Sequence, residues 1–385
     1  MFPAFIACFS VGSVLGLLAC RFADRWGCAK KYHSPIPKQV LIALISGIAA
    51  AGLYWWEVKH GMLMPLDMPK STLFQASEQM SLLTIFLQRY TIHLILFTLL
   101  LAATLTDFYE MIIPDSITVF GTLLALLAAF LFPLAALPGT NHLLDFSLPG
   151  FVFTPAVTPP GEMSPVWTSE ENRLASLFLM ITLWWFWCFA MLDRVWYARL
   201  SFRKANAIFW RYLYRSPMTK LYITAALLIP FFFVVVFASD TDAVSEIALL
   251  SALTGMSVGM LLVWAVRLVA QYILGVEAMG FGDVTLMGMI GAFIGWQAVV
   301  LVFFLAPFFG LIYGIINVAL GKGRAVPYGP FLCLATVVML LAWRPIWFTT
   351  SEYFEMGLGM FGMILLGLLL LFAGLLHIVH NLLAK

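Results

Sequence analysis

Charged residues are scarce in this chain, and their scarcity excludes a soluble globular protein. Asp, Glu, Lys and Arg make up 10% of the 385 residues, whereas 63% are hydrophobic; globular proteins average about 25% charged residues. The formal net charge of +2 is too small to predict nucleic acid as a partner. The composition therefore predicts an all-α, polytopic membrane protein whose main surroundings are the lipid bilayer.

Cysteine is also sparse. The five cysteines form no Cys-x-x-Cys pair, so the sequence offers neither a disulfide framework nor a four-cysteine zinc site. Loop 21–38 contains Cys28, with His33 as the other candidate ligand, and two ligands do not form a structural zinc site. We therefore predict no metal site.

Long apolar runs recur from end to end. A membrane-spanning helix needs about 20 largely apolar residues, and this criterion gives about eleven candidate spans. They lie near residues 2–20, 39–56, 82–106, 116–132, 174–192, 221–238, 246–268, 284–295, 297–320, 329–342 and 355–378. The sequence therefore predicts a transmembrane bundle of about eleven helices, in which the run 284–295 is too short for a straight crossing.

Lys and Arg are distributed unevenly between the predicted loops. They favour cytoplasmic loops, and most, including Arg267, gather on that side if the first span runs from outside to inside. Arg89 is then counted with the outer segments, and Glu57 is interpreted as a solvated residue of an outer loop. His93 is interpreted as a helix-packing or interface residue. The same orientation brings Asp107 and Asp283 to the cytoplasmic membrane face.

Asp107 ends an apolar run and begins the segment 107–115. A carboxylate at a helix C-terminus opposes the helix dipole, which makes Asp107 a functional candidate; the alternative is a solvated residue at the end of a span. Pro114 suits the start of the following helix, and Asp115 is predicted to cap that helix.

The second candidate, Asp283, ends the motif Gly280-Phe281-Gly282-Asp283. Gly280 and Gly282 permit close approach by an extended peptide, although a Gly-Asp turn also suits a helix cap. Two carboxylates at one membrane face would share a proton, so that one activates water and the other hydrogen-bonds a scissile carbonyl. This is the chemistry of aspartyl proteolysis, and the sequence does not assign the acid and the base.

These motifs resemble those of the type 4 prepilin peptidases, bacterial inner-membrane aspartyl proteases of the GxGD type. The segment 107–115 is similar to the first catalytic motif of that family, and 280–283 to the second. The segment 327–330 resembles its Pro-Phe-Gly-Pro sequence, with Tyr328 in place of Phe. The resemblance implies two catalytic residues, Asp107 and Asp283, and the supporting residues Gly280, Gly282, Pro114, Asp115, Pro327, Gly329 and Pro330.

The resemblance also implies a function. Members of the family cut the positively charged leader from prepilin or pseudopilin precursors at the cytoplasmic face of the bacterial inner membrane, and proteolysis needs no cofactor. Many also methylate the new amino terminus with S-adenosylmethionine, an activity that the unpaired Cys28 leaves open here. We predict that Glu110 and Glu277, which flank the motifs, attract the leader. Expected partners are these precursors and the pilus or secretion machinery.

The predicted organisation has five parts. They are N-terminal spans with a degenerate methyltransferase-like region (1–81), two parts of a peptidase core (82–132 and 246–342), an insertion (133–245) and a C-terminal span (343–385). Two alternatives remain open: a transporter that binds protons or cations at Asp107 and Asp283, and an inactive scaffold derived from a peptidase.

Overall fold

The structure is a computed structural model, and the part of the chain that it describes is helical throughout, without strands. It describes residues 2–26, 36–61, 76–135, 137, 170–192, 204, 206–207, 210–211, 217–238, 243–274, 279–320, 327–354, 362–368, 370 and 374. The predicted all-α fold class is confirmed. Glu277, Cys28, His33 and most of the predicted span 355–378 lie outside the described residues.

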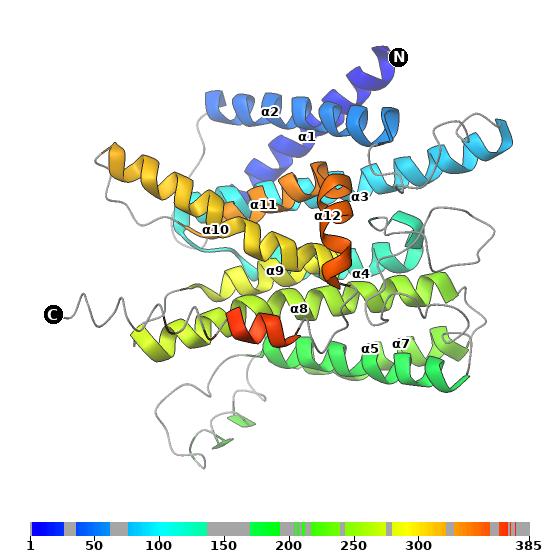
Figure 1. Cartoon of the computed structure of the whole chain (residues 1–385), viewed down its shortest axis with the longest axis vertical. Coiled ribbons are helices and arrows are strands. Elements are labelled where there is room, and N and C mark those ends of the chain that lie inside the picture. The colour runs from blue at the N-terminus through cyan, green and yellow to red at the C-terminus, as the bar shows by residue number, and fades with distance from the viewer. Residues whose placement is uncertain are drawn as a thin grey trace. The chain divides into compact units, whose positions relative to one another are not determined.

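The chain forms two compact units, one of residues Met1–Ser164 and Ile247–Lys385, the other of Pro165–Glu246. The first unit contains α1 (Phe2–Trp26), α2 (Ile36–Tyr54), the π-helical turn η1 (Trp55–Lys59), α3 (Ala76–Glu110), α4 (Asp115–Leu131), the 3-10 turn η3 (Pro133–Ala135), α9 (Phe281–Ile294), α10 (Trp296–Ala319), α11 (Gly329–Leu341) and α12 (Trp343–Phe354) (Figure 1). Helix α8 (Ala243–Leu274) begins in the second unit and continues into the first.

The second unit is built on α5 (Glu170–Ala190) and α7 (Pro217–Ala238), which pack together. The indole N–H groups of Trp184 and Trp185 donate to the carbonyls of Ala225 and Ala226, at 3.2 and 2.9 Å. This unit overlaps the predicted insertion 133–245, whose boundaries stay a prediction.

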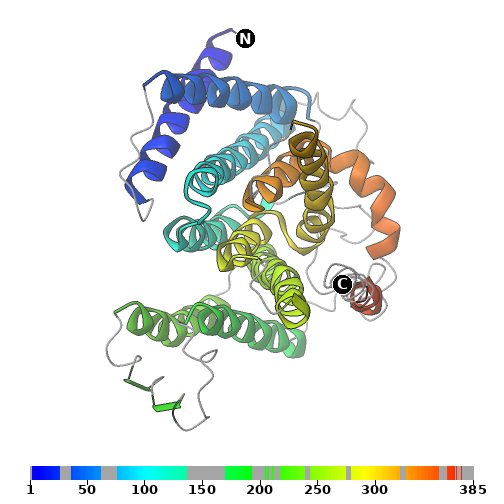
Figure 2. The same ribbon diagram turned by 90° about the vertical axis from the view of Figure 1, so that its left-hand side faces the viewer.

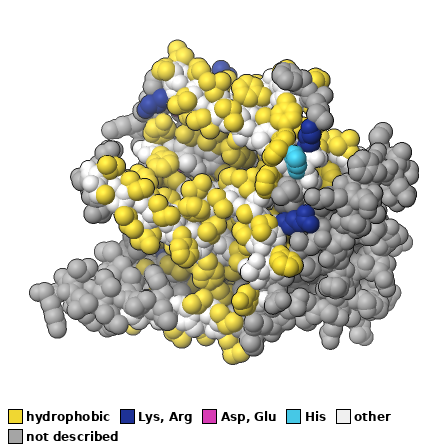
Figure 3. All heavy atoms as spheres, turned by 45° about the horizontal axis from the view of Figure 1, so that its top comes forward, with side chains coloured by type: hydrophobic (Ala, Val, Ile, Leu, Met, Phe, Trp, Pro, Cys, Tyr) yellow, Lys and Arg dark blue, Asp and Glu magenta, His cyan; other side chains and the backbone are white. Residues whose placement is uncertain are grey.

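Five described helices are long and apolar enough to cross a bilayer: Pro3–Asp24, Ile36–Lys59, Leu83–Glu110, Ser245–Ile273 and Trp296–Asn317. Helices α11 and α12, bent by 85° at their junction, provide a sixth if the pair forms one span. The predicted number of eleven is not confirmed, because α4, α5, α7 and α9 are shorter apolar helices. Where Figure 3 shows described residues, their outer side chains are mainly hydrophobic, as expected for a surface in lipid. The chain is a multi-pass membrane protein.

Helices α1 and α2 form a hairpin through close backbone contact, visible along one edge of the first unit (Figure 2). A Cβ atom at Gly16 would lie 2.6 Å from the Ser46 Oγ, and one at Gly47 would meet Ser13. Small residues at such an interface let helix backbones approach each other in a membrane. The hairpin packs on α3, where the Tyr90 hydroxyl donates to the Ala50 carbonyl at 3.2 Å.

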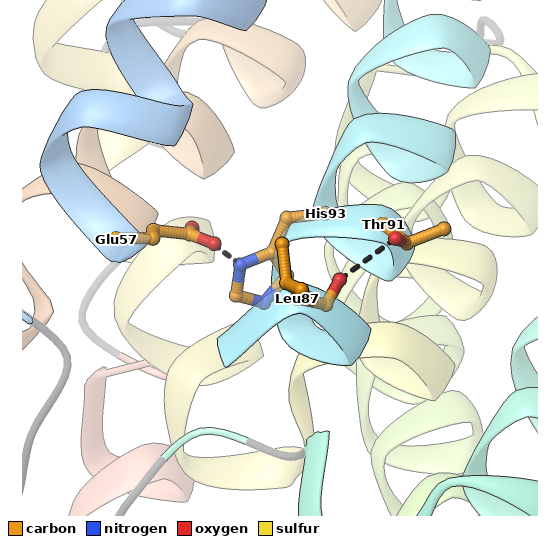
Figure 4. A network of polar contacts seen from close by, with 4 residues as sticks. All are labelled: Glu57, Leu87, Thr91 and His93. Carbon is orange, nitrogen blue, oxygen red and sulfur yellow. Dashed lines mark hydrogen bonds and ion pairs between the residues drawn. The ribbon is translucent and has the colours of Figure 1, made fainter. Parts of the chain in front are cut away.

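The end of this hairpin carries a buried ion pair. The π-helical turn directs Glu57 toward α3, where its Oε1 lies 2.6 Å from the His93 Nδ1 (Figure 4). Glu57, His93 and Arg89 are each 1% exposed, and the Glu57 charge attracts the Arg89 guanidinium. The interpretation of Glu57 as a solvated loop residue was therefore wrong, because the π-helical turn extends α2 and buries this side chain. Arg89, counted with the outer segments, lies inside α3.

We expect His93→Leu to destabilise the protein by about 3–5 kcal/mol, because it leaves the buried Glu57 carboxylate without its imidazole partner. Thermal unfolding in detergent measures the effect. His60→Leu is the matched control, since His60 is an exposed histidine just beyond the same turn. Equal unfolding midpoints for the two variants would show that the ion pair contributes nothing to stability.

Candidate active site

Asp107 lies in the last turn of α3 and is 5% exposed. Its Oδ2 accepts a hydrogen bond from the backbone N–H of Gly329 at 3.1 Å. Gly329 is the first residue of α11, so this N–H belongs to a helix end whose amide groups lack intrahelical partners and which favours negative charge. The N-terminus of α11 therefore compensates for the unfavourable position of Asp107 at the C-terminus of α3.

Close approach at this contact requires a residue without a side chain. A Cβ atom at Gly329 would lie 2.6 Å from the Asp107 Oδ2 and 2.7 Å from the Ile113 Cδ1. Pro330 follows in the first turn of α11, where its missing N–H does no harm. Pro327, half-buried, precedes this turn. The segment 327–330 thus supports the Asp107 carboxylate with its backbone.

The loop between α3 and α4 has most of the features predicted from its sequence. Helix α3 ends at Glu110, and Met111 adopts a positive φ of 53° directly after it, a common helix ending. Pro114 is buried and extended (φ −67°, ψ 134°), and it occupies the N-cap position predicted for Asp115. Asp115 is exposed in the first turn of α4, where its negative charge suits the helix dipole.

Asp283 lies in the first turn of α9 and is 8% exposed. Gly280 is the N-cap of this helix, with φ −69° and ψ 155°, and its backbone N–H donates a hydrogen bond to the Asp283 carboxylate. Asp283 is the third residue of α9, and its side chain accepts the backbone N–H of the N-cap residue. This is one of the two hydrogen bonds of a capping box. Asp283 is therefore fixed in orientation by the turn that precedes it.

The second motif packs directly on the loop that follows Asp107. A Cβ atom at Gly282 would lie 2.9 Å from the Ile113 Cβ and 3.1 Å from the Ile113 carbonyl oxygen. One turn further on, the Thr118 hydroxyl donates to the Thr285 hydroxyl at 3.1 Å, which joins α4 to α9. Gly282 is thus needed where the two motif backbones meet.

The two aspartates lie within electrostatic range of each other, and their charges repel. From α11, the thiol of Cys333 lies within range of both carboxylates. Burial raises the pKa of the Tyr328 hydroxyl above its usual range, and the Asp283 charge adds to the shift. This hydroxyl therefore stays protonated and able to donate a hydrogen bond. Three motifs that are far apart in sequence meet at one site.

The remaining candidates contribute differently. Glu110 is half-buried at the end of α3 and Glu277 lies outside the described residues. Among the described residues, no cluster of three or more His, Cys, Asp or Glu side chains is arranged to hold a metal ion.

Sequence reasoning missed Arg267. It was assigned to a cytoplasmic loop, but α8 continues to Leu274 and Arg267 is 7% exposed. Its guanidinium carbon lies 6.0 Å from the centre of the Phe281 ring, and its charge attracts Asp283. The available signal was an arginine followed at once by apolar residues of the same helical run, shortly before the GxGD motif.

Comparison with known proteins relates the part of the site that contains Asp283 to one family. A sequence profile of the type IV leader peptidase family matches residues 218–315. Two proteins named prepilin leader peptidase/N-methyltransferase, from Stutzerimonas stutzeri and Pseudomonas aeruginosa, are each 38% identical to the chain over 93 residues, which is 23% of this chain and 32% of theirs. One of the same name from Aeromonas salmonicida is 34% identical over an equal length.

The chain spans about a third of the length of these curated relatives, 32% in each case. No solved structure matches the chain. The profile match includes the Gly280–Asp283 motif and Arg267, whereas Asp107 and the segment 327–330 lie outside it. Residues 218–315, with the GxGD motif, are therefore similar to the type IV leader peptidase family.

Proposed function

We propose that the protein is a membrane aspartyl endopeptidase that cleaves the leader from type 4 prepilin or pseudopilin-like precursors. The observation that carries this proposal is the meeting of two buried carboxylates, Asp107 and Asp283, from separate motifs of the chain. The family match of residues 218–315 supports the same reaction. Asp107 and Asp283 lie at the ends of helices rather than midway along two broken helices, and this location favours a peptidase over a transporter.

The proposed reaction needs one shared proton. The ionised aspartate accepts a proton from water as the water oxygen attacks the scissile carbonyl, and the protonated aspartate donates its proton to the carbonyl oxygen. The tetrahedral intermediate, which carries two hydroxyl groups, then collapses: the C–N bond breaks, the protonated aspartate gives its proton to the leaving nitrogen, and the ionised aspartate takes a proton from one of the hydroxyls as the new carboxyl group forms. The dyad is thereby left again with one shared proton. The pair titrates as a unit. The fixed hydrogen bonds from Gly329 and Gly280 hold both carboxylates ready for this exchange.

The substrate must bring an extended segment to the membrane boundary. A helix hides its carbonyl groups in intrahelical hydrogen bonds, so the bond to be cut must lie where the helix is unwound. We place this point at the cytoplasmic face of a bacterial inner membrane, with the apolar helix of the precursor among the spans. Glu110 and Glu277 are the proposed attraction for the positively charged leader, and pilus or secretion machinery is the proposed later partner.

Methylation is a separate activity. The names of the relatives include N-methyltransferase, and that reaction would require S-adenosylmethionine as the methyl donor. The match to those relatives covers only about a third of their length, 32%, and loop 21–38 contains no second cysteine beside Cys28. We therefore limit the proposed activity to proteolysis.

Co-expression with a candidate precursor tests the proposal. We expect intact-mass spectrometry to show loss of the basic leader and a new amino terminus, because the dyad hydrolyses one peptide bond. The same spectrum reports methylation as the added mass of one methyl group. If none of a panel of prepilin and pseudopilin precursors is shortened by the wild-type protein in membranes, the proposed function is wrong.

A further inference from the structure

Arg267 is a buried cation beside a proposed dyad of two buried anions. A charged side chain at membrane depth is unfavourable and usually pairs with an opposite charge. Arg267 is 7% exposed, and the carboxylate that it attracts is that of Asp283. Arg267 is therefore buried within electrostatic range of Asp283, rather than exposed in a cytoplasmic loop.

The guanidinium also contacts the turn that carries Asp283. Its central carbon lies 6.0 Å from the centre of the Phe281 ring, within the range at which a cation is attracted to an aromatic face. Phe281 and Asp283 stand in the same first turn of α9. Arg267 thus interacts with this turn at two positions, one through the ring and one through the charge.

The helix that carries Arg267 is held firmly against α9. The backbones of Gly255 and Gly291 touch, so that a Cβ atom on either would overlap the carbonyl group of the other. Gly259 meets the Met287 carbonyl in the same way, and Gly288 meets Met260. With these contacts, Arg267 has a fixed position relative to Asp283.

A count of charges shows what this position does. Among the described residues, the titratable groups within electrostatic range of Asp283 are Asp107 from α3, Tyr328 just before α11, Cys333 from α11 and Arg267 from α8. Counted over these described groups, the site carries a net negative charge with both aspartates ionised, even with Arg267. With one shared proton the same groups are electrically neutral. A buried site of low dielectric favours the neutral form. Without Arg267, the neutral form has both aspartates protonated, which leaves no general base.

We infer that Arg267 is a positioning residue that makes the one-proton form of the Asp107–Asp283 dyad the electrically neutral one and holds the first turn of α9 through Phe281. This inference rests on the proposed function for its link to cleavage. The electrostatic part applies to the two carboxylates whether or not a precursor is cut.

The pH dependence of cleavage distinguishes this role from simple packing. In Arg267→Gln the dyad binds protons more tightly, so we expect the acid limb of kcat to move upward by about one pH unit, with kcat at neutral pH reduced about tenfold and KM unchanged. Arg267→Lys keeps the charge and should keep the wild-type acid limb. Phe281→Leu should lower kcat without moving the limb. An acid limb of Arg267→Gln that stays at the wild-type pH would overturn the inference.

A second readout does not depend on cleavage. Carbodiimides react with protonated carboxyl groups, so peptide mapping of carbodiimide-treated protein in detergent reports the pH range in which Asp107 and Asp283 hold protons. We expect labelling to persist to higher pH in Arg267→Gln than in the wild type and Arg267→Lys. Lys220→Gln, which removes a positive charge at an exposed position of α7, is the control and should behave as wild type. Identical labelling in all four proteins contradicts the inference, whereas absent cleavage with shifted labelling contradicts only the proposed function.

Discussion

Replacement of either Asp107 or Asp283 by Asn is expected to abolish precursor cleavage, with a loss of at least about 10²–10⁴-fold. Asn has the shape of Asp, and its carbonyl oxygen can still accept the N–H of Gly329 or Gly280. The fold should therefore survive, while the proton exchange of the dyad is lost. Intact-mass spectrometry of a co-expressed precursor measures cleavage, and protease protection of the membranes measures insertion.

The design of this experiment includes two comparisons. The double variant should be no worse than either single variant, because residues that act as one unit lose activity non-additively. Asp24→Asn changes an aspartate near the end of α1, outside the three motifs, and should leave cleavage intact. Substantial cleavage by either single dyad variant would remove that residue from the catalytic role.

Gly329→Ala is expected to reduce kcat by about 10²-fold while barely changing stability. The added methyl group would overlap the Asp107 Oδ2 and the Ile113 Cδ1, at 2.6 and 2.7 Å. Both atoms are the ends of side chains, so they can move without disturbing a backbone. The displaced oxygen belongs to the carboxylate that is proposed to exchange the catalytic proton, and the hydrogen bond from the Gly329 N–H is weakened with it. Cleavage rates and thermal unfolding, measured on the same preparation, separate the two effects.

A matched glycine provides the control. Gly314 in α10 has open space where a Cβ atom would stand, so Gly314→Ala should keep full activity and slightly stabilise the helix. If Gly329→Ala cleaves as fast as Gly314→Ala, Asp107 is not held by its contact with Gly329 in the way that the reaction requires. If Gly329→Ala instead unfolds, Asp107 is more important to the fold than to the chemistry.

The positions of the helices follow from local sequence, and the predictions made from it are largely accurate. Apolar runs near 2–20, 39–56 and 82–106 correspond to α1, α2 and α3, and Pro114 separates α3 from α4 as expected. These outcomes depend on neighbours in the chain alone. The number of spans depends on helix length and tilt, which tertiary packing sets, and the bend of 85° between α11 and α12 had no counterpart in the prediction.

The contacts of the site were harder to predict because they join distant segments. Orientation from Lys and Arg suggested that Asp107 and Asp283 share a membrane face, but the amide of Gly329 as a partner of Asp107 is visible only once α11 is placed against α3. The same applies to Arg267, and to Glu57 with His93. In each case one charged residue looks solvated in sequence until the helix that carries its partner is known.

The shortness of α9 has a consequence for how the protein enters the membrane. From Asp283 to Ile294 every residue except Phe293 is buried by the rest of the chain, and a helix of 14 residues extends only about 21 Å, less than the hydrocarbon core of about 30 Å. Such a segment is too short to span the bilayer alone and has almost no surface to expose to lipid. During biogenesis α9 therefore depends on helices such as α4, which packs against it, for its place in the membrane, and Asp283 reaches its position only together with them.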